Sequence, residues 1–277
     1  MKKFRPKIGG AVYILPNLLT SGNLFFGYFS VMKALQGDYF WAATAILLSS
    51  IFDVLDGQVA RLTKGTSEFG VQYDSLCDLI SFGLAPSFLM YQYALSGLGR
   101  LGLIFGFLFL ACGALRLARF NVQSSIGKTK GDFVGLPIPM AAGVIACFVG
   151  LTSENYDLEG TNFIIANIFH FLSLSQVRFG FFAVMTPFLA IMMVSNLTYR
   201  THKSLKIKGV KAFRLLALLV TLVAIAAYQP MLVGFLFFFL YSLTGPLEWV
   251  LGWKKAADED EIFQEDEGEE EDLEQEG

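Results

Sequence analysis

Long apolar stretches, separated by short polar and charged segments, dominate the pattern of residues along the chain. Most are about as long as the ~20 residues that an α-helix needs to cross a bilayer, and their ends fall at Gly, Pro, Asn or charged residues. The pattern predicts an all-α protein, a polytopic transmembrane helical bundle of about eight spans. The expected spans are residues 15–35, 39–60, 71–94, 99–120, 135–151, 177–197, 213–228 and 230–251.

Composition supports this class and divides the chain. Of 277 residues, 54% are hydrophobic and only 16% are charged, more apolar surface than a soluble domain of this length could bury. We expect a basic arm at 1–12, a membrane core at 13–200, a basic loop with two additional transmembrane helices at 201–253, and a tail at 254–277. A short interfacial helix is expected at 162–174, because this segment is too short to span.

Charge is distributed unevenly. Residues 258–277 hold 13 of the 24 acidic residues and no basic one, which predicts a disordered tail. The remaining chain has 11 acidic against 21 basic residues, which suits anionic lipid head groups and phosphates. With eight spans the basic loops share one face and the acidic loop at 153–159 lies on the other. The positive-inside rule then predicts a multi-pass protein of the cytoplasmic (inner) membrane with both termini, and the turn at 61–70, in the cytoplasm.

Four carboxylates interrupt the apolar pattern between the second and third spans. Asp53 and Asp56 are three residues apart, and Asp74 and Asp78 are four apart, so each pair lies on one helical face. A turn at 62–69 would bring the two pairs together. Such a group of acids near lipid needs a cation, and oxygen ligands suit Mg²⁺ or Mn²⁺. Two such ions, about 3.5–4 Å apart, could promote in-line displacement at phosphorus. The alternative is a set of ordinary charges at helix ends.

The spacing of these acids with neighbouring small and basic residues resembles a known family. The pattern D-x2-D-G-x2-A-R-x8-G-x3-D-x3-D is similar to that of the CDP-alcohol phosphatidyltransferases, which move a phosphatidyl group from a CDP-activated lipid to an alcohol and release CMP. Its positions here are Asp53, Asp56, Gly57, Ala60, Arg61, Gly70, Asp74 and Asp78. The resemblance implies a six-helix catalytic core, and it extends over roughly residues 13–145.

By position, the resemblance implies a role for each of these residues. Asp53, Asp56, Asp74 and Asp78 would be metal ligands, and Asp78 would also be the general base. Eight residues would contact the nucleotide and pyrophosphate. One is Asn17, two residues before a Leu-Thr pair in the first span, and the others are Thr20, Asp56, Gly57, Ala60, Arg61, Ser67 and Gly70. From the residues alone, Asn17, Thr20 and Asn23 share one side of the first predicted helix, where they either cap and pack or face the polar site.

The acceptor alcohol is predicted from three further stretches. Residues 81–86, 115–121 and 135–142 resemble the branch of the family in bacteria and archaea that transfers the phosphatidyl group to L-serine. A serine carboxylate needs a cation, and Arg116 or Arg119, with Asn121, are the candidates. We therefore expect CDP-diacylglycerol, L-serine and membrane lipids as partners, no nucleic acid, and a homodimer.

Two alternatives remain open at this point. The first is the same chemistry with another acceptor, such as glycerol 3-phosphate, inositol or inositol phosphate. The second is a divalent-cation transporter, since carboxylates within a membrane also mark ion pathways. Transport is disfavoured because the four acids gather in one region and Gly57, Arg61 and Gly70 have no role in conduction.

Overall fold

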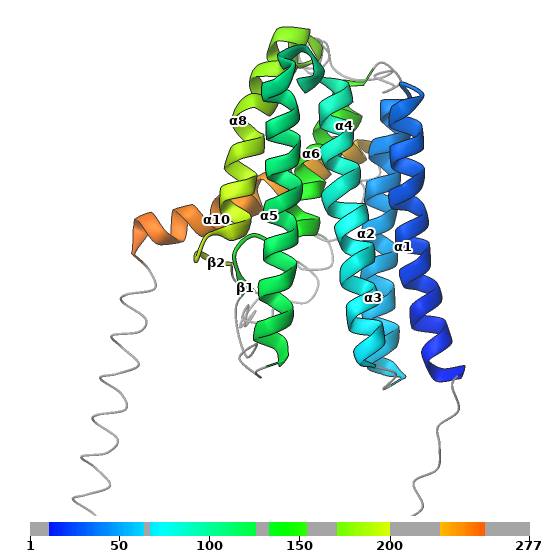
Figure 1. The fold of residues 1–277 in the computed structure, drawn as a ribbon. Helices are drawn as coiled ribbons and strands as arrows, with labels where there is room; N and C mark the ends of the chain where they lie inside the picture. Colours follow the sequence, from blue (N-terminus) through cyan, green and yellow to red (C-terminus); the bar gives the residue numbers. More distant parts are fainter. Residues whose placement is uncertain (1–10, 64–66, 126–132, 154–170, 200–227, 253–277) are drawn as a thin grey trace, which may run out of the picture.

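Helices make up nearly all of the computed structural model, which describes residues 11–63, 67–125, 133–153, 171–199 and 228–252 (Figure 1). The helices are α1 (Ala11–Leu35), α2 (Tyr39–Leu62), α3 (Glu68–Asp78), the π-helix η1 (Leu79–Leu84), α4 (Ala85–Tyr93), the 3₁₀-helix η2 (Leu95–Leu98), α5 (Arg100–Ser125), α6 (Ile138–Thr152), α8 (Ser175–Val194) and α10 (Pro230–Leu251). Two short strands, β1 (Phe133–Val134) and β2 (Thr198–Tyr199), pair antiparallel.

Four of the described helices, α2, α5, α8 and α10, are long and apolar enough to cross a membrane. Large apolar side chains project from them into the surroundings, as lipid-facing residues would; Phe107 and Val184 are each 67% exposed. The shorter α6 is buried along almost its whole length, which fits a central helix that is apolar on every side. The predicted class, an all-α polytopic membrane protein, is confirmed.

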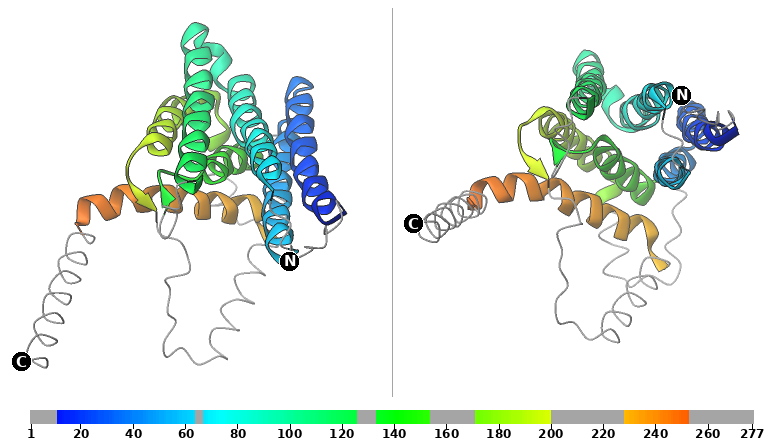
Figure 2. Two further views of the ribbon diagram at one scale, coloured as in Figure 1. Left: turned by 60° about the horizontal axis from the view of Figure 1, so that its bottom comes forward. Right: turned by 90° about the horizontal axis from the view of Figure 1, so that it is seen from below.

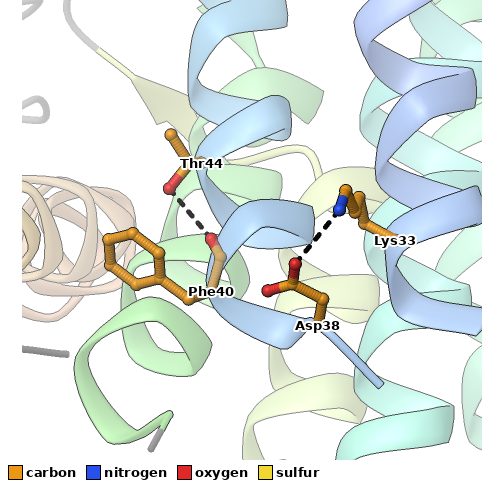
Figure 3. Close-up of polar contacts among 4 residues, drawn as sticks. All are labelled: Lys33, Asp38, Phe40 and Thr44. Carbon is orange, nitrogen blue, oxygen red and sulfur yellow. Dashed lines mark hydrogen bonds and ion pairs between the residues drawn. The ribbon is translucent and has the colours of Figure 1, made fainter. Parts of the chain in front are cut away.

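The hairpin of α1 and α2 sets the side of the bundle that carries the acids. Gly37, with a φ of 77°, ends the first helix in a conformation that suits glycine. The carboxylate of Asp38 then lies 3.2 Å from the ammonium of Lys33, across the turn, and Thr44, in the second turn of α2, donates to the carbonyl of Phe40 in the first (Figure 3). The two helices therefore run antiparallel, and the start of α1 lies beside the end of α2.

The third predicted span is a helix of three parts. It begins at Glu68, three residues before the expected start, and passes from α3 into η1 directly after Asp78. Pro86, which the sequence predicts as a kink, lies in the first turn of α4, where its missing N–H breaks the α-helical ladder. The π turn comes just before this proline: the backbone N–H of Ala85 reaches the carbonyl of Ile80, five residues back.

The last described helix, α10, has the predicted bounds, but it does not align with α1 and α2. Seen from below, α1 and α2 are nearly end-on, whereas α10 lies lengthwise across the bundle (Figure 2). It follows a groove of small residues on α6: Phe238 lies against Gly143, Gly234 against Cys147, and Met231 against Gly150.

A second contact holds the far half of α10. The hydroxyl of Tyr199, in β2, donates to the carbonyl of Ser242 at 3.2 Å. The ring of Tyr199 is fully buried, and any side chain at Gly245 would collide with it.

Several predictions fall wholly or largely outside the described residues: the basic arm, the helix at 162–174, the span at 213–228 and the acidic tail.

Candidate metal and nucleotide site

Three carboxylates meet where the end of α2 faces the start of α3. Asp53 and Asp56 come from successive turns of α2, and Asp74 comes from the second turn of α3. One carboxylate oxygen from each lies within 4.8 Å of the others, a separation at which a single ion could contact all three. The structure thus brings together three of the four predicted metal ligands at ligand spacing.

Two oxygen atoms of this group have no partner within the part of the chain that the structure describes. Oδ2 of Asp56 and Oδ1 of Asp74 are shielded from solvent and make no hydrogen bond among the described residues. Burying an unpaired charged oxygen is strongly unfavourable, so carboxylates in such positions are normally paired or bound to a metal. The donor set is oxygen only, as hard divalent cations prefer, and the residues present therefore fit a bound metal ion.

Asp78 lies one turn further along α3 and differs from the other three. Its carboxylate is within hydrogen-bonding reach of Asp53, but it is not part of the three-residue group. Its Oδ1 accepts a hydrogen bond of 2.9 Å from Nδ2 of Asn23 in α1. Asp78 is thus next to the ligand cluster, with one oxygen already fixed by the protein.

A cavity of about 220 Å³ opens beside the three carboxylates. All of the residues predicted to bind the nucleotide and pyrophosphate line it, as do Asp74 and two residues that the sequence did not single out, Pro16 and Val71. The predicted residues are Asn17, Thr20, Asp56, Gly57, Ala60, Arg61, Ser67 and Gly70. They come from α1, α2 and the start of α3, and their contact with a nucleotide stays a prediction.

Local sequence shapes the walls of this cavity. Ser67 caps α3, because its hydroxyl accepts from the backbone N–H of Gly70 at 2.9 Å. A side chain at Gly70 would come within 3.1 Å of that hydroxyl and 3.5 Å of Oδ1 of Asn17. At Gly57 the nearest atom to an added Cβ is Nη2 of Arg61, at 3.9 Å, so a larger side chain there would extend into the cavity.

The three candidates for binding the acceptor are placed differently from one another. Arg116 is 8% exposed and interacts electrostatically with Asp78 and Asp53. Its guanidinium carbon lies 5.3 Å from the ring centroid of Phe120, and it makes no hydrogen bond or ion pair with any described residue. A buried, unpaired cation beside the acids is suited to receive an anionic group.

Arg119 and Asn121 connect helices instead. Arg119 donates to the carbonyls of Val194 at 2.9 Å and Ser195 at 3.1 Å, where α8 ends, so its donors stabilise a helix C-terminus. Nδ2 of Asn121 donates to the hydroxyl of Ser75 at 2.9 Å, which ties α5 to α3. Within the described residues, Arg116 is therefore the candidate whose charged group remains free for a ligand.

Part of the site has only a weak signal in the sequence. Asn23 was predicted only as one of three polar residues on a helix side, Ser81 only as part of the stretch at 81–86, and Ser49 not at all. All three are fully buried near Asp78, and each serine bonds to Asn23. The signal that could have found them is the presence of polar side chains well inside apolar spans, where they seldom occur without a partner.

An apolar helical bundle with an all-oxygen acid cluster that could hold a cation, and with an adjoining cavity lined in part by polar residues, is typical of membrane enzymes that use a divalent cation. The family model for CDP-alcohol phosphatidyltransferase matches residues 13–176. The chain belongs to this family, whose members are metal-dependent enzymes.

Curated relatives extend the match over most of the chain. A protein of Helicobacter pylori J99 named CDP-diacylglycerol–serine O-phosphatidyltransferase is 34% identical over 239 residues, which is 86% of this chain and 92% of that protein. One of the same name from H. pylori 26695 is 37% identical over 70% of this chain and 75% of its own length. The archaetidylserine synthase of Methanothermobacter thermautotrophicus is 43% identical over 50% of this chain and 60% of its own.

Proposed function

We propose that the protein transfers a phosphatidyl group from CDP-diacylglycerol to the hydroxyl of L-serine, releasing CMP and forming phosphatidylserine. The observation that carries this proposal is the similarity to the Helicobacter pylori protein of that name, which extends over 92% of the relative. The geometry agrees, because two acids of the family pattern, Asp56 and Asp74, line one cavity together with its small residues and Arg61.

The cavity supplies the proposed site for the CDP end of the donor. Asn17 and Thr20 line one wall, and Arg61 can donate from two nitrogens to a pyrophosphate oxygen pair. Gly57 leaves the space that a Cβ would fill, so a nucleotide can approach the backbone of α2. The acyl chains of the donor would extend into the bilayer around the apolar helices.

Asp53, Asp56 and Asp74 would hold a divalent cation, with Asp78 completing a two-metal site; we propose Mg²⁺ or Mn²⁺. When bound, the metal supplies positive charge that offsets the negative charge at the reacting phosphorus. The unpartnered oxygens of Asp56 and Asp74 support this assignment.

Asp78 is proposed as the general base. The serine oxygen forms a bond to the phosphorus that carries diacylglycerol, the bond from that phosphorus to the phosphate oxygen of CMP breaks, and the hydroxyl proton passes to Asp78. Because Oδ1 of Asp78 is held by Asn23, Oδ2 is the oxygen placed to take the proton. Direct transfer is favoured, since the hydroxyls among the described residues that line the cavity have structural bonds: Thr20 donates to the carbonyl of Pro16, and Ser67 caps α3.

Arg116 is proposed to bind the carboxylate of serine. Replacing it with alanine should raise the KM for serine by about 10- to 100-fold, the scale of a lost charge-assisted hydrogen bond, and leave the KM for CDP-diacylglycerol nearly unchanged. Steady-state CMP release with each substrate varied in turn measures this.

The matched control is Arg119→Ala, which removes the same charge three residues further along α5. It should lower the melting temperature, because α8 loses its C-terminal donors, and change both KM values alike. A selective serine effect in Arg119→Ala and none in Arg116→Ala would reverse this assignment.

The proposed activity itself is tested by CMP release from CDP-diacylglycerol in detergent. We expect release that depends on serine and stops when a chelator removes divalent cations. Release with glycerol 3-phosphate, inositol or inositol phosphate, but not with serine, would keep the family and reject the acceptor. Absence of release with any acceptor, together with cation flux into vesicles that contain the protein, would favour transport instead.

The cellular setting is proposed from charge and family resemblance. The basic loops predict the cytoplasmic membrane, with both termini and the site facing the cytoplasm, where CDP-linked precursors are made. A homodimer is proposed from the resemblance alone.

A further inference from the structure

A buried polar network surrounds Asn23, in the middle of α1. Its Nδ2 donates to Oδ1 of Asp78 at 2.9 Å, its Oδ1 accepts from the hydroxyl of Ser49 at 2.7 Å, and its backbone carbonyl accepts from the hydroxyl of Ser81 at 3.0 Å. Asn23, Ser49 and Ser81 are each 0% exposed. Three separate elements, α2, α3 and η1, therefore meet at one asparagine.

The carboxylate of Asp78 determines which way the amide of Asn23 points, and the hydroxyl of Ser49 holds that orientation. An ionised carboxylate can only accept, so the NH₂ group of the amide must face Asp78. The amide oxygen then faces Ser49, whose hydroxyl donates to it, and a flipped amide would set oxygen against carboxylate oxygen. Ser49 does not touch Asp78 in this network, and its influence passes through Asn23.

The backbone on both sides of Asn23 is held as well. Ser81 lies in the π-helix that follows Asp78, and its bond to the carbonyl of Asn23 fixes α1 against this turn. One helical turn after Asn23, Gly27 packs against Ser81 so closely that a Cβ would lie 2.8 Å from the Cα of Ser81. The donor amide and the acceptor carboxylate are thus anchored by close packing of the elements that carry them.

We propose that Asn23 is a positioning residue for Asp78 and that Ser49 holds the amide of Asn23 in place. This inference rests on the proposed function, in which Asp78 takes the proton from the acceptor hydroxyl. The hydrogen bond fixes one carboxylate oxygen, which sets the rotation of the group and aims the other oxygen at the reacting atoms. Catalytic geometry of this kind must hold within about 0.5 Å, and locking by surrounding hydrogen bonds is the usual means.

Close packing of the helices alone does not explain why polar side chains occupy the buried positions of Asn23 and Ser49. A buried amide in an apolar span is unfavourable unless its groups are paired, and a leucine of similar shape would fill the same space without that requirement. The chain instead places an asparagine and a serine that together direct one N–H at one oxygen of the proposed base. A buried network with all its members satisfied gives a single defined arrangement.

The test compares Asn23→Leu, Ser49→Ala and the double variant by steady-state CMP release with serine. Asn23→Leu keeps the shape and removes the bond, and should lower kcat by about 10- to 100-fold, with the KM for CDP-diacylglycerol within about twofold of wild type. Ser49→Ala should lower kcat by about three- to tenfold, because the amide oxygen loses the hydrogen bond that holds it and the amide becomes more mobile. In the double variant, the Ser49 change should have no further effect, since its influence passes through Asn23.

Ser50→Ala is the matched control, because among the described residues the hydroxyl of Ser50 bonds only to the carbonyl of Ile46 in its own helix, and the kcat of this variant should equal that of wild type. An unchanged kcat in Asn23→Leu, or additive effects in the double variant, would overturn the proposal. If Asn23→Leu does not fold, the kcat of Ser49→Ala decides the matter, since it removes a single oxygen. Failure of the proposed function is distinct: wild type would then release no CMP with serine.

Discussion

Asp78→Asn is expected to lower serine-dependent CMP release by about 10²–10⁴-fold, the contribution of a well-placed general base. Asparagine has nearly the shape of aspartate and can still accept from Nδ2 of Asn23 through its amide oxygen, so the buried network should persist. Its other terminal atom is an NH₂ group, which cannot take a proton from serine. The loss should therefore appear in kcat, measured by CMP release at saturating CDP-diacylglycerol and serine.

Asp38→Asn is the matched control for this variant. It makes the same chemical change just before the start of α2, whereas the acid group lies near the end of that helix. The carboxylate of Asp38 pairs there with Lys33 (Figure 3). Partly exposed pairs of this kind contribute little to stability, so both activity and melting temperature should stay close to wild type. Substantial turnover in Asp78→Asn would show that another group accepts the proton, and would also remove the basis for a positioning role of Asn23.

The second large effect is expected for Asp56→Asn, which removes one carboxylate from the three-residue acid group. Activity should fall by more than about 10²-fold, because the loss of groups that only orient metal ligands already costs 10- to 100-fold. Asp56 contributes an oxygen that has no partner within the described structure, and an uncharged amide would hold a divalent cation far less strongly.

Thermal unfolding separates metal binding from turnover in this variant. Wild type should melt at a higher temperature in Mg²⁺ or Mn²⁺ than in chelator, because an ion that binds only the folded state stabilises it. Asp56→Asn should lose most of that increase, yet melt above wild type in chelator, since one of three adjacent negative charges is gone. The exposed Glu68, in the first turn of α3, gives the control Glu68→Gln, which should keep the full metal-induced increase. An undiminished increase in Asp56→Asn would place the cation elsewhere.

Much of the fold was predictable because the signals are local. The bounds of α10 match the expected residues, and α2 extends only two residues beyond its predicted end, since apolar length and helix-breaking residues act within a few positions. The acids were predictable for the same reason: spacings of three and four residues place two side chains on one helical face wherever the helix lies. The turn between α2 and α3 then leaves few ways to arrange the two pairs.

Features that depend on contacts between distant segments were not predictable. The bond from Asn23 to Asp78 joins residues 55 positions apart, and the sequence gives no measure of which polar residue in a span meets which acid. Arg116 and Arg119 are equivalent in sequence as two basic residues at the end of an apolar run. They are separated only by the position of the end of α8, which occupies the donors of Arg119. The path of α10 likewise depends on where the small residues of α6 point.

The π-helix after Asp78 has a consequence for how this part of the chain can change. A π turn accommodates one residue more than the α-helix around it, so it acts as an insertion within a continuous rod. Deleting one residue from 79–84 would restore regular winding and would still leave a helix. Because the wider turn takes up the extra residue, this deletion would leave the acids of α3 and the buried face of α4 in nearly the same relative orientation. A one-residue deletion inside the regular part of α3 has no such compensation and would rotate the residues on its two sides by about 100° relative to one another. Length changes of one residue should therefore be tolerated better in 79–84 than in the α-helical turns that carry Asp74 and Asp78.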